Sequence, residues 1–354
     1  MHTTSRLLAT ALVVAVLACG DDDDDRTNDP STADPCEGIG GTCVGFPAGT
    51  PEATIAGAIA QAQPGTTFAF GAGTFRFTNS LQVGADGITI RGAGRETTTL
   101  DFAGVGPEGI GAEGVADFTV QDLGVVDASG NCIKVTDGER VTFRNVKTWW
   151  TNPDPSKHGG YGIYPVLSTH VLVEGCYAEG ASDTGIYVGQ SDNIVVRNNE
   201  ATGNVAGIEI ENCTLADVHD NHVHGNAGGI LAFNLPLPKQ PNENQVRIFD
   251  NVVEDNDGEN FAAPGNVVAL VPTGTGLIIL ANRKVEVFGN TFRNNGTAAI
   301  AIANYGLAAA PPEGFDPFPG SVHVHGNTFE NNGTAPDQGS QLGAALDVIM
   351  GDAR

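Results

Sequence analysis

The sequence predicts an all-β protein, a right-handed parallel β-helix of about 9–10 coils with a short N-terminal capping helix. Gly is abundant (48 of 354 residues) and only 17% of residues are charged, which favours short strands and tight turns over long helices. Asn pairs five residues apart follow alternating strands at Asn199/Asn204, Asn221/Asn226, Asn251/Asn256, Asn290/Asn295 and Asn327/Asn332. Another strand recurs in steps of 23, 22, 22 and 47 residues at Gly162-Ile163, Gly185-Ile186, Gly207-Ile208, Gly229-Ile230 and Gly276-Leu277.

A repeat of this length, with three short strands per turn, is typical of a β-helix. Stacked coils place identical residues above one another, so we expect each Asn to hydrogen-bond the Asn of the next coil. Alternation along the strands predicts that one series of side chains points inward, namely Ile163, Ile186, Ile208 and Ile230.

The N-terminal residues 1–18 predict a lipoprotein signal peptide. The apolar run Leu7–Ala18 follows Arg6 and is too short to span a bilayer permanently. It ends in Val16-Leu17-Ala18-Cys19, which resembles a bacterial lipobox and makes Cys19 the predicted lipidation site, with an ordinary secretory signal as the alternative. The sequence therefore predicts a lipid-anchored protein of the bacterial cell envelope whose contact with the membrane is only the lipid on Cys19.

Residues 19–50 are predicted to form a lipidated acidic tether followed by a small loop. Eight acidic residues against Arg26 give the segment Cys19–Glu37 a charge of −7, and a polar composition of this kind should stay extended. The total charge is −25, so the remaining folded part carries −19. Cys36 and Cys43 are close enough in sequence to close a loop as a disulfide in an oxidising compartment. Three further cysteines lie in repeat positions and are expected to be buried thiols: Cys132, Cys176 and Cys213.

Residues 51–354 are predicted to form a single β-helix domain with a cap at its start. Pro51–Gln63 has apolar residues at helical spacing, with Thr50 as the expected N-cap, and a helix there would cover open strand edges. Leu342–Met350 is expected to form a short cap at the other end.

Three stretches carry a resemblance to a known family: residues 180–199 (GASDTGIYVGQSDNIVVRNN), 204–212 (NVAGIEIEN) and 274–282 (GTGLIILAN). There the chain resembles a family of bacterial right-handed β-helix-repeat lipoproteins, which is similar in fold to pectate lyases. The resemblance implies a pectin-lyase-like fold and a possible c-type cytochrome partner. It implies no particular reaction.

Four insertions into the regular repeat of coils predict a cleft over the outer face of the Gly-Ile strands. Residues 148–160 and 257–273 precede such strands, and residues 235–243 and 305–320 follow them. Alternation predicts two outward columns on this face. The first contains Lys134, Tyr164, Tyr187, Glu209 and Leu231, and the second contains Thr136, Val166, Gly189, Glu211 and Phe233.

Polar and aromatic residues gather in the middle coils of these columns, as a sugar site requires. The candidate catalytic residues are Glu209, Glu211, Tyr187 and Lys134. The candidate substrate-binding residues are Tyr164, Tyr187, Trp149, Trp150, His158 and Phe233.

These residues are compatible with several kinds of chemistry. The carboxyl groups of Glu209 and Glu211 suit glycoside hydrolysis, and binding of Ca²⁺ is the alternative. Tyr187 beside Lys134 or His158 suits a lyase or an epimerase that removes a proton next to a uronate carboxylate. The alternative is that these residues form no functional site. They would then be a solvated acidic face, with tyrosines covering the sheet.

Alginate and pectate are disfavoured as substrates. Tyr161–Val166 (YGIYPV) resembles the YG-x-DPH stretch of alginate C5-epimerases, but Tyr164 and Val166 replace its acidic residue and its histidine. A domain charge of −19 also repels polyuronates unless cations bridge them.

We expect no metal site and no cofactor, with Ca²⁺ as the one possible ion. Same-side pairs such as His222/His224 and His323/His325, with His219 near the first, have the spacing of Cu²⁺ or Zn²⁺ ligands. Turn and surface histidines are, however, commoner than metal sites.

The leading functional hypothesis is a cell-envelope protein that binds a carbohydrate over the Gly-Ile strands, with processing of that carbohydrate left open. If it is an enzyme, hydrolase, lyase and epimerase activities all stay open. The alternative is a noncatalytic scaffold or partner-binding protein of a redox system with a c-type cytochrome. With 17 basic against 42 acidic residues, a nucleic-acid partner is disfavoured.

Overall fold

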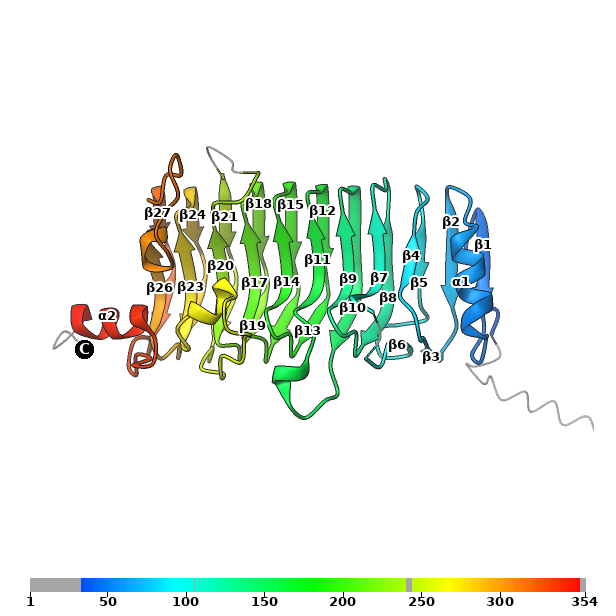
Figure 1. Ribbon diagram of the computed structural model, residues 1–354, viewed down its shortest axis with the longest axis horizontal. Helices are drawn as coiled ribbons and strands as arrows, with labels where there is room; N and C mark the ends of the chain where they lie inside the picture. The colour runs from blue at the N-terminus through cyan, green and yellow to red at the C-terminus, as the bar shows by residue number, and fades with distance from the viewer. Residues whose placement is uncertain (1–32, 105, 240–243, 351–354) are drawn as a thin grey trace, which may run out of the picture.

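The computed structural model describes residues 33–104, 106–239 and 244–350, and Figure 1 shows them as a row of stacked coils. The predicted signal peptide, Cys19 and most of the predicted tether lie outside the described residues. Strands of successive coils pair in parallel, so the predicted parallel β-helix is confirmed.

One of the two sheets holds the Gly-Ile strands and is called the Gly-Ile sheet below. Among the described residues it has nine strands, in agreement with the predicted number of coils. In spatial order they are β4 (Leu81–Val83), β7 (Glu108–Glu113), β9 (Asn131–Thr136), β11 (Tyr161–Val166), β14 (Thr184–Gly189), β17 (Ala206–Glu211), β20 (Gly228–Phe233), β23 (Thr275–Leu280) and β26 (Ala298–Ala303).

The other sheet has two columns of strands and is called the double sheet. The long strands β8 (Thr119–Val126) and β10 (Glu139–Trp149) belong to both columns. The first column adds β1 (Thr42–Phe46), β2 (Thr66–Phe70), β5 (Thr89–Arg91), β12 (Thr169–Glu174), β15 (Asp192–Arg197), β18 (Thr214–His219), β21 (Val246–Phe249), β24 (Arg283–Phe288) and β27 (Gly320–His325). The second adds β3 (Gly73–Arg76), β6 (Thr98–Asp101), β13 (Tyr177–Glu179), β16 (Glu200–Thr202), β19 (His222–His224), β22 (Val252–Glu254), β25 (Thr291–Arg293) and β28 (Thr328–Glu330).

Short helices lie at the two ends and in the loops. Helix α1 (Glu52–Ala60) lies at the N-terminal end, as predicted, and α2 (Gln341–Met350) lies at the C-terminal end (Figure 1). The loops contain the 3₁₀ helices η2 (Pro155–Lys157), η3 (Val267–Leu270) and η4 (Tyr305–Leu307). In the described part of the chain, no helix has the length and apolar composition needed to cross a membrane.

The expected N-cap of α1 is wrong. Pro51 occupies the N-cap position, and the hydroxyl of Thr50 donates instead to the carbonyl oxygen of Pro47 at 2.6 Å. Thr50 therefore belongs to the preceding turn. The helix is held by packing, because Ile55 and Ile59 on its inner face are buried in the main core.

The main core runs along the coil axis, as the alternation predicts. Ile163, Ile186, Ile208 and Ile230 are fully buried and pair in register across consecutive coils. Each coil therefore contributes an aliphatic layer, and burial of these layers is the main stabilising contribution to the solenoid.

Two ladders of buried asparagines confirm the expected coil-to-coil hydrogen bonds. In each ladder the side-chain amide of one Asn donates to the side-chain oxygen of the Asn in the next coil at 2.8–3.1 Å. The same oxygen accepts a backbone N–H, as when Asn221 accepts from the amide of Asn199 at 3.0 Å. These bonds satisfy polar groups that the turns would otherwise leave buried and unpaired.

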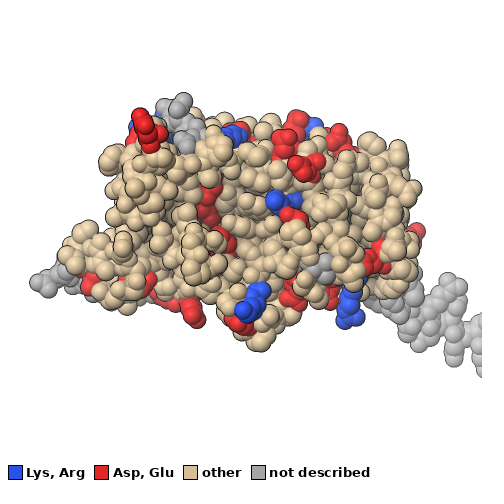
Figure 2. Space-filling model, viewed as in Figure 1, with Lys and Arg blue, Asp and Glu red and all other residues tan. Residues whose placement is uncertain are grey.

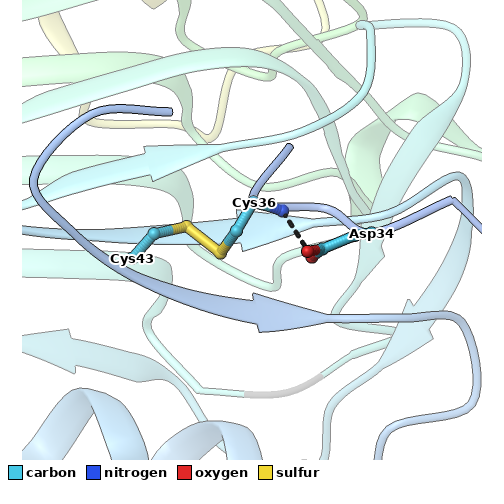
Figure 3. The surroundings of a disulfide bond; sticks show 3 residues. All are labelled: Asp34, Cys36 and Cys43. Atoms are coloured by element: carbon cyan, nitrogen blue, oxygen red, sulfur yellow. Dashed lines mark hydrogen bonds between the residues drawn. A yellow bond between two sulfur atoms is a disulfide. The ribbon is translucent and has the colours of Figure 1, made fainter. Parts of the chain in front are cut away.

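The cysteines fall into two classes, as expected. Cys36 and Cys43 form a disulfide that ties the preceding loop to β1, and the backbone N–H of Cys36 donates to Asp34 at 2.9 Å (Figure 3). Strand β1 itself begins at Thr42, within the segment predicted to be tether and loop, and pairs with β2. Cys132, Cys176 and Cys213 are free and buried, and burial raises the pKa of the Cys176 and Cys213 thiols to about 12.

Candidate functional site

The outward columns of the Gly-Ile sheet have the register that the alternation predicts. Tyr164 pairs with Lys134, Tyr187 pairs with Glu209, and Glu209 pairs with Leu231. In the next column Glu211 lies between Gly189 and Phe233.

The four loops border this sheet, but they do more than flank a cleft. From β20 onward, side chains of three of them (residues 235–239, 257–273 and 305–308) cover the sheet and form a second hydrophobic cluster with it, separate from the main core. This cluster contains Val205, Ala206, Leu231, Phe233, Leu235, Val268, Val271, Ile278, Leu280, Ala301 and Ala303. An open floor therefore does not extend along the whole sheet, because apolar side chains on the later strands attract the loops over them.

Phe233 illustrates this correction. Its ring is 2% exposed inside the second cluster, rather than on an open sugar-binding floor. A cavity of about 440 Å³ lies beside it, between the sheet, η3 and the segment leading into α2. Its lining is largely aliphatic, with Leu270, Ile278 and Leu280 among the side chains, so it offers little for recognising sugar hydroxyls.

The predicted acids and tyrosines do come together in the middle coils. We call the set Tyr161, Tyr164, Asp183, Tyr187, Glu209 and Glu211 the acid–tyrosine cluster. The phenol of Tyr187 donates to Glu211 at 2.8 Å, and the hydroxyl of Thr184 donates to Glu209 at 2.8 Å. Glu209, Tyr187 and Glu211 are only 2%, 4% and 8% exposed, so these side chains point away from the main core yet lie in a largely desolvated place.

Desolvation sets the charge state of the three carboxyl groups. Burial raises the pKa of Glu209 well above its ordinary value, and the neighbouring charges of Glu211 and Asp183 raise it further. Burial also raises the pKa of Glu211 to about 7, against the hydrogen bond from Tyr187, and that of Asp183 to about 6. The three groups titrate together, and at neutral pH they retain protons that isolated carboxyl groups would have lost.

The hydrogen bonds of Thr184 support a shared proton. Its hydroxyl oxygen lies 2.8 Å from Glu209 and 3.2 Å from an oxygen of Asp183. A hydroxyl has one hydrogen to donate, so a protonated carboxyl group that donates to this oxygen would let both contacts be full hydrogen bonds.

Asp183 is a member of the cluster that the sequence analysis missed. It directly precedes β14, at the position where the next two coils have the buried apolar residues Val205 and Ala227. A carboxyl group in an otherwise apolar column was the available signal. Asn266, from the loop 257–273, donates to Asp183 at 3.0 Å and so connects that loop to the site.

Gly189 was also missed, although it lies in a predicted column. A Cβ at this position would collide with the phenol ring of Tyr187. The missing side chain thus gives the Tyr187 ring room to lie over the backbone and to reach Glu211.

The three tyrosines form a compact aromatic group. The rings of Tyr161 and Tyr164 stack at 4.4 Å, and the Tyr187 ring lies 4.7 Å from that of Tyr164. Tyr161 and Tyr164 are half-buried and are therefore more accessible than Tyr187. Lys134 lies 5.7 Å from the centre of the Tyr164 ring and 3.5 Å from Glu108, so it belongs to the rim and not to the carboxyl cluster.

The remaining aromatic candidates lie apart from these tyrosines. Trp149 packs over Gly124 with Lys147 Nζ 5.0 Å from its ring, on the double sheet, so the structure places it away from the predicted site. Trp150 donates to the carbonyl oxygen of Ala128 at 2.7 Å and stacks on His158.

His158 holds its own loop in place. Its Nδ1 lies 2.6 Å from the carbonyl oxygen of Gly180 and its Nε2 lies 2.7 Å from that of Asn152. Both ring nitrogens are thereby engaged, which removes His158 as a proton acceptor for a substrate.

Figure 2 shows a hollow on this face, with acidic side chains inside it and few basic ones nearby. We call the recess over β11, β14 and β17 the hollow. Within the described residues, two sets of side chains bring three ligand atoms within 4.8 Å of one another, Glu200/His222/His224 and Glu286/His323/His325. The three carboxyl groups of the hollow are not such a set, so their geometry does not favour Ca²⁺ there.

A family model described as "Right handed beta helix region" matches residues 108–266 and 156–307, which together exceed half of the chain. No curated protein sequence matches this chain.

Solved structures of similar fold include the mannuronan C-5 epimerase AlgE6 A-module of Azotobacter vinelandii. It is 16% identical with a TM-score of 0.60, over 80% of this chain and 73% of that one. An alginate lyase from Paenibacillus sp. str. FPU-7 is 16% identical (TM-score 0.51, 82% and 98% covered). Pectate lyase Pel9A is also 16% identical (TM-score 0.51, 88% and 85% covered). At such identities the likeness shows the fold alone.

Proposed function

Because the chain belongs to the right-handed β-helix family, we propose that it binds a carbohydrate in the hollow and processes it by acid–base chemistry. The observation that carries the proposal is the hydrogen bond of 2.8 Å between Tyr187 and Glu211 beside the half-buried ring of Tyr164. A ring on which a sugar can stack lies there beside an acid with a raised pKa.

The acid in this proposal is Glu211. It is the most exposed of the three buried carboxyl groups, and its raised pKa lets it keep a proton near neutral pH. In its protonated form it would give this proton to the oxygen of the glycosidic bond that breaks, as a general acid does in glycoside hydrolysis. Water would add to the sugar carbon that is released, and the proton that this water loses would restore the acid. Burial, and after it the charge of Asp183, keep the pKa of Glu211 high.

We further propose that the carbohydrate is uncharged at the cluster. The proteins of similar fold described above are named for mannuronan, alginate and pectate, which are all polyuronates. Here three carboxyl groups surround the site, and the nearest lysine, Lys134, is paired with Glu108 at the rim. A uronate carboxylate would find no opposite charge in the cluster, whereas neutral hydroxyl groups can hydrogen-bond to it.

A glycan array with the purified protein, followed by calorimetry, tests this site. Tyr164→Ala is expected to weaken binding about tenfold, because it removes the accessible ring face on which a sugar would stack. Tyr177→Ala is the matched control, since Tyr177 is a partly exposed tyrosine of the double sheet. Equal losses in both variants, or none in Tyr164→Ala, would place the carbohydrate elsewhere.

The same titrations distinguish the two functional hypotheses. Binding with release of product supports the enzyme, whereas binding without product from any selected glycan supports the noncatalytic scaffold. A c-type cytochrome partner belongs to that second hypothesis.

We also propose export and lipid anchoring in the cell envelope. The Cys36–Cys43 disulfide is compatible with an oxidising compartment, and Val16-Leu17-Ala18-Cys19 is the proposed lipobox. Cys19→Ser is expected to release the protein from membranes or to block its maturation, measured by fractionation and by mass spectrometry of the acyl group. Cys43→Ser is the control and should stay on the membrane. If wild type and Cys19→Ser are equally soluble and neither is acylated, the proposal is wrong.

A further inference from the structure

A carboxylate and two imidazoles converge on the double sheet, away from the hollow. Glu200 lies on β16, and His222 and His224 lie on the next strand, β19, with all three half-buried. One potential ligand atom from each lies within 4.8 Å of the other two. His222 and His224 are two residues apart on one face of the strand, with ring centres 4.2 Å apart.

The contacts of His222 match the surroundings of a metal-ligating histidine. Its Nε2 lies 2.9 Å from Glu254, which leaves Nδ1 as the nitrogen for a metal. Glu254 is in turn fixed by an ion pair with Arg293. A carboxylate that accepts from one ring nitrogen orients the imidazole and makes the other nitrogen a better ligand.

His224 supplies the second nitrogen. Its Nε2 lies 3.2 Å from Glu200, a contact that a metal ion would replace by bridging the two atoms. Tetrahedral coordination at metal–ligand distances of about 2.0–2.2 Å puts ligand atoms roughly 3.4 Å apart. The ligand atoms must therefore move closer together on binding, and the side chain of Glu200, which is 43% exposed, is free to rotate toward the imidazoles.

We propose that Glu200, His222 and His224 form a binding site for a divalent transition-metal ion of the Zn²⁺ or Cu²⁺ type. Two imidazole nitrogens and one carboxylate suit such ions, whereas Ca²⁺ and Mg²⁺ prefer all-oxygen sites. The expectation of no metal site rested on the general frequency of turn and surface histidines. Glu200 and Glu254, which lie in the adjacent coils, complete the arrangement.

The chain contains a similar set that serves as an internal control. Glu286, His323 and His325 also converge, but both imidazoles face the single carboxylate of Glu286, and the side chain of His323 is 70% exposed. His222 in contrast has its own anchored carboxylate, Glu254. We therefore expect tight binding at the first set and weaker binding at the second.

The test uses untagged, EDTA-treated protein and titrates Zn²⁺ against a chromophoric chelator. Wild type is expected to bind one Zn²⁺ tightly. The double variant His222→Gln/His224→Gln should lower the affinity for this Zn²⁺ ion by at least about 100-fold. Glu254→Gln should lower it by about 10–100-fold. The control His323→Gln/His325→Gln should leave it unchanged. Electron paramagnetic resonance of the Cu²⁺ form should show coupling to two nitrogens in wild type and lose it in His222→Gln/His224→Gln.

Three results would overturn the proposal. One is tight binding of one Zn²⁺ ion by His222→Gln/His224→Gln. Another is the loss of this tight binding in the control variant. The third is Zn²⁺ binding that is no tighter than Ca²⁺ binding. Melting temperatures of the metal-free variants, expected to equal that of wild type, show that the substitutions leave the fold intact.

Discussion

Glu211→Gln is expected to lower the turnover of the selected glycan by about 10²–10⁴-fold while leaving its affinity within a factor of about three. The substitution keeps the size of the side chain and an oxygen that accepts the hydrogen bond of Tyr187, but it removes the proton that Glu211 donates. Product analysis under single-turnover conditions separates this loss of chemistry from binding, which calorimetry measures.

The pH dependence provides an independent check of the same role. Burial raises the pKa of Glu211 to about 7, and the proposed general acid is the protonated form. Turnover should therefore be high below pH 7 and fall as the pH rises through about 7. Glu211→Gln should abolish this fall together with the activity.

Glu113→Gln is the matched control, because Glu113 is an exposed acid on the same sheet. It should retain both the rate and the pH profile of wild type. If Glu211→Gln turns over at the wild-type rate, Glu211 is not the acid and the proposed mechanism fails.

Ile208→Asp is expected to unfold the solenoid locally or to lower its free energy of unfolding by about 4 kcal/mol or more. Ile208 is fully buried in the main core between Ile186 and Ile230, so a carboxylate there would be desolvated and unpaired. Thermal melts combined with limited proteolysis measure the effect, since coils of a solenoid can open separately.

The adjacent residue provides the control for this prediction. Glu209→Gln should change stability by about 1 kcal/mol or less, although Glu209 is as buried as a core residue. Burial raises the pKa of Glu209 and so favours its neutral form, which a glutamine resembles. Ile208→Val should cost about 0.5–1.5 kcal/mol. Equal destabilisation by Ile208→Asp and Glu209→Gln would mean that the assignment of the two faces is wrong.

The raised pKa values of the cluster also have a cost for stability. A carboxyl group whose pKa is higher in the folded than in the unfolded state stabilises the fold fully only below its unfolded pKa. For Glu211 and Asp183 this contribution is lost as the pH rises through about 6 to 7. The site is thus a place where chemistry opposes stability, as is common for functional groups held in desolvated positions.

The sequence by itself determined the coil register and the faces of the strands. In a parallel solenoid, residues that are about one coil apart in the sequence lie next to each other in space. The pairings of Tyr187 with Glu209 and of Asn199 with Asn221 could therefore be predicted, and so could the inward direction of Ile208. The locations of the four insertions followed from the same period.

Only the tertiary structure decided how the loops pack, and the loops determine the environment of the site. They cover the later strands and bury Phe233, and Asn266 reaches Asp183 across 83 residues of sequence. No local pattern fixes the path of an insertion, because that path depends on which exposed apolar surface it can bury. The path of the loops determines how far Glu209 and Glu211 are desolvated, and desolvation in turn determines their charge. The outward columns of the Gly-Ile sheet were therefore predictable from the sequence, but the protonation of the acids in them was not.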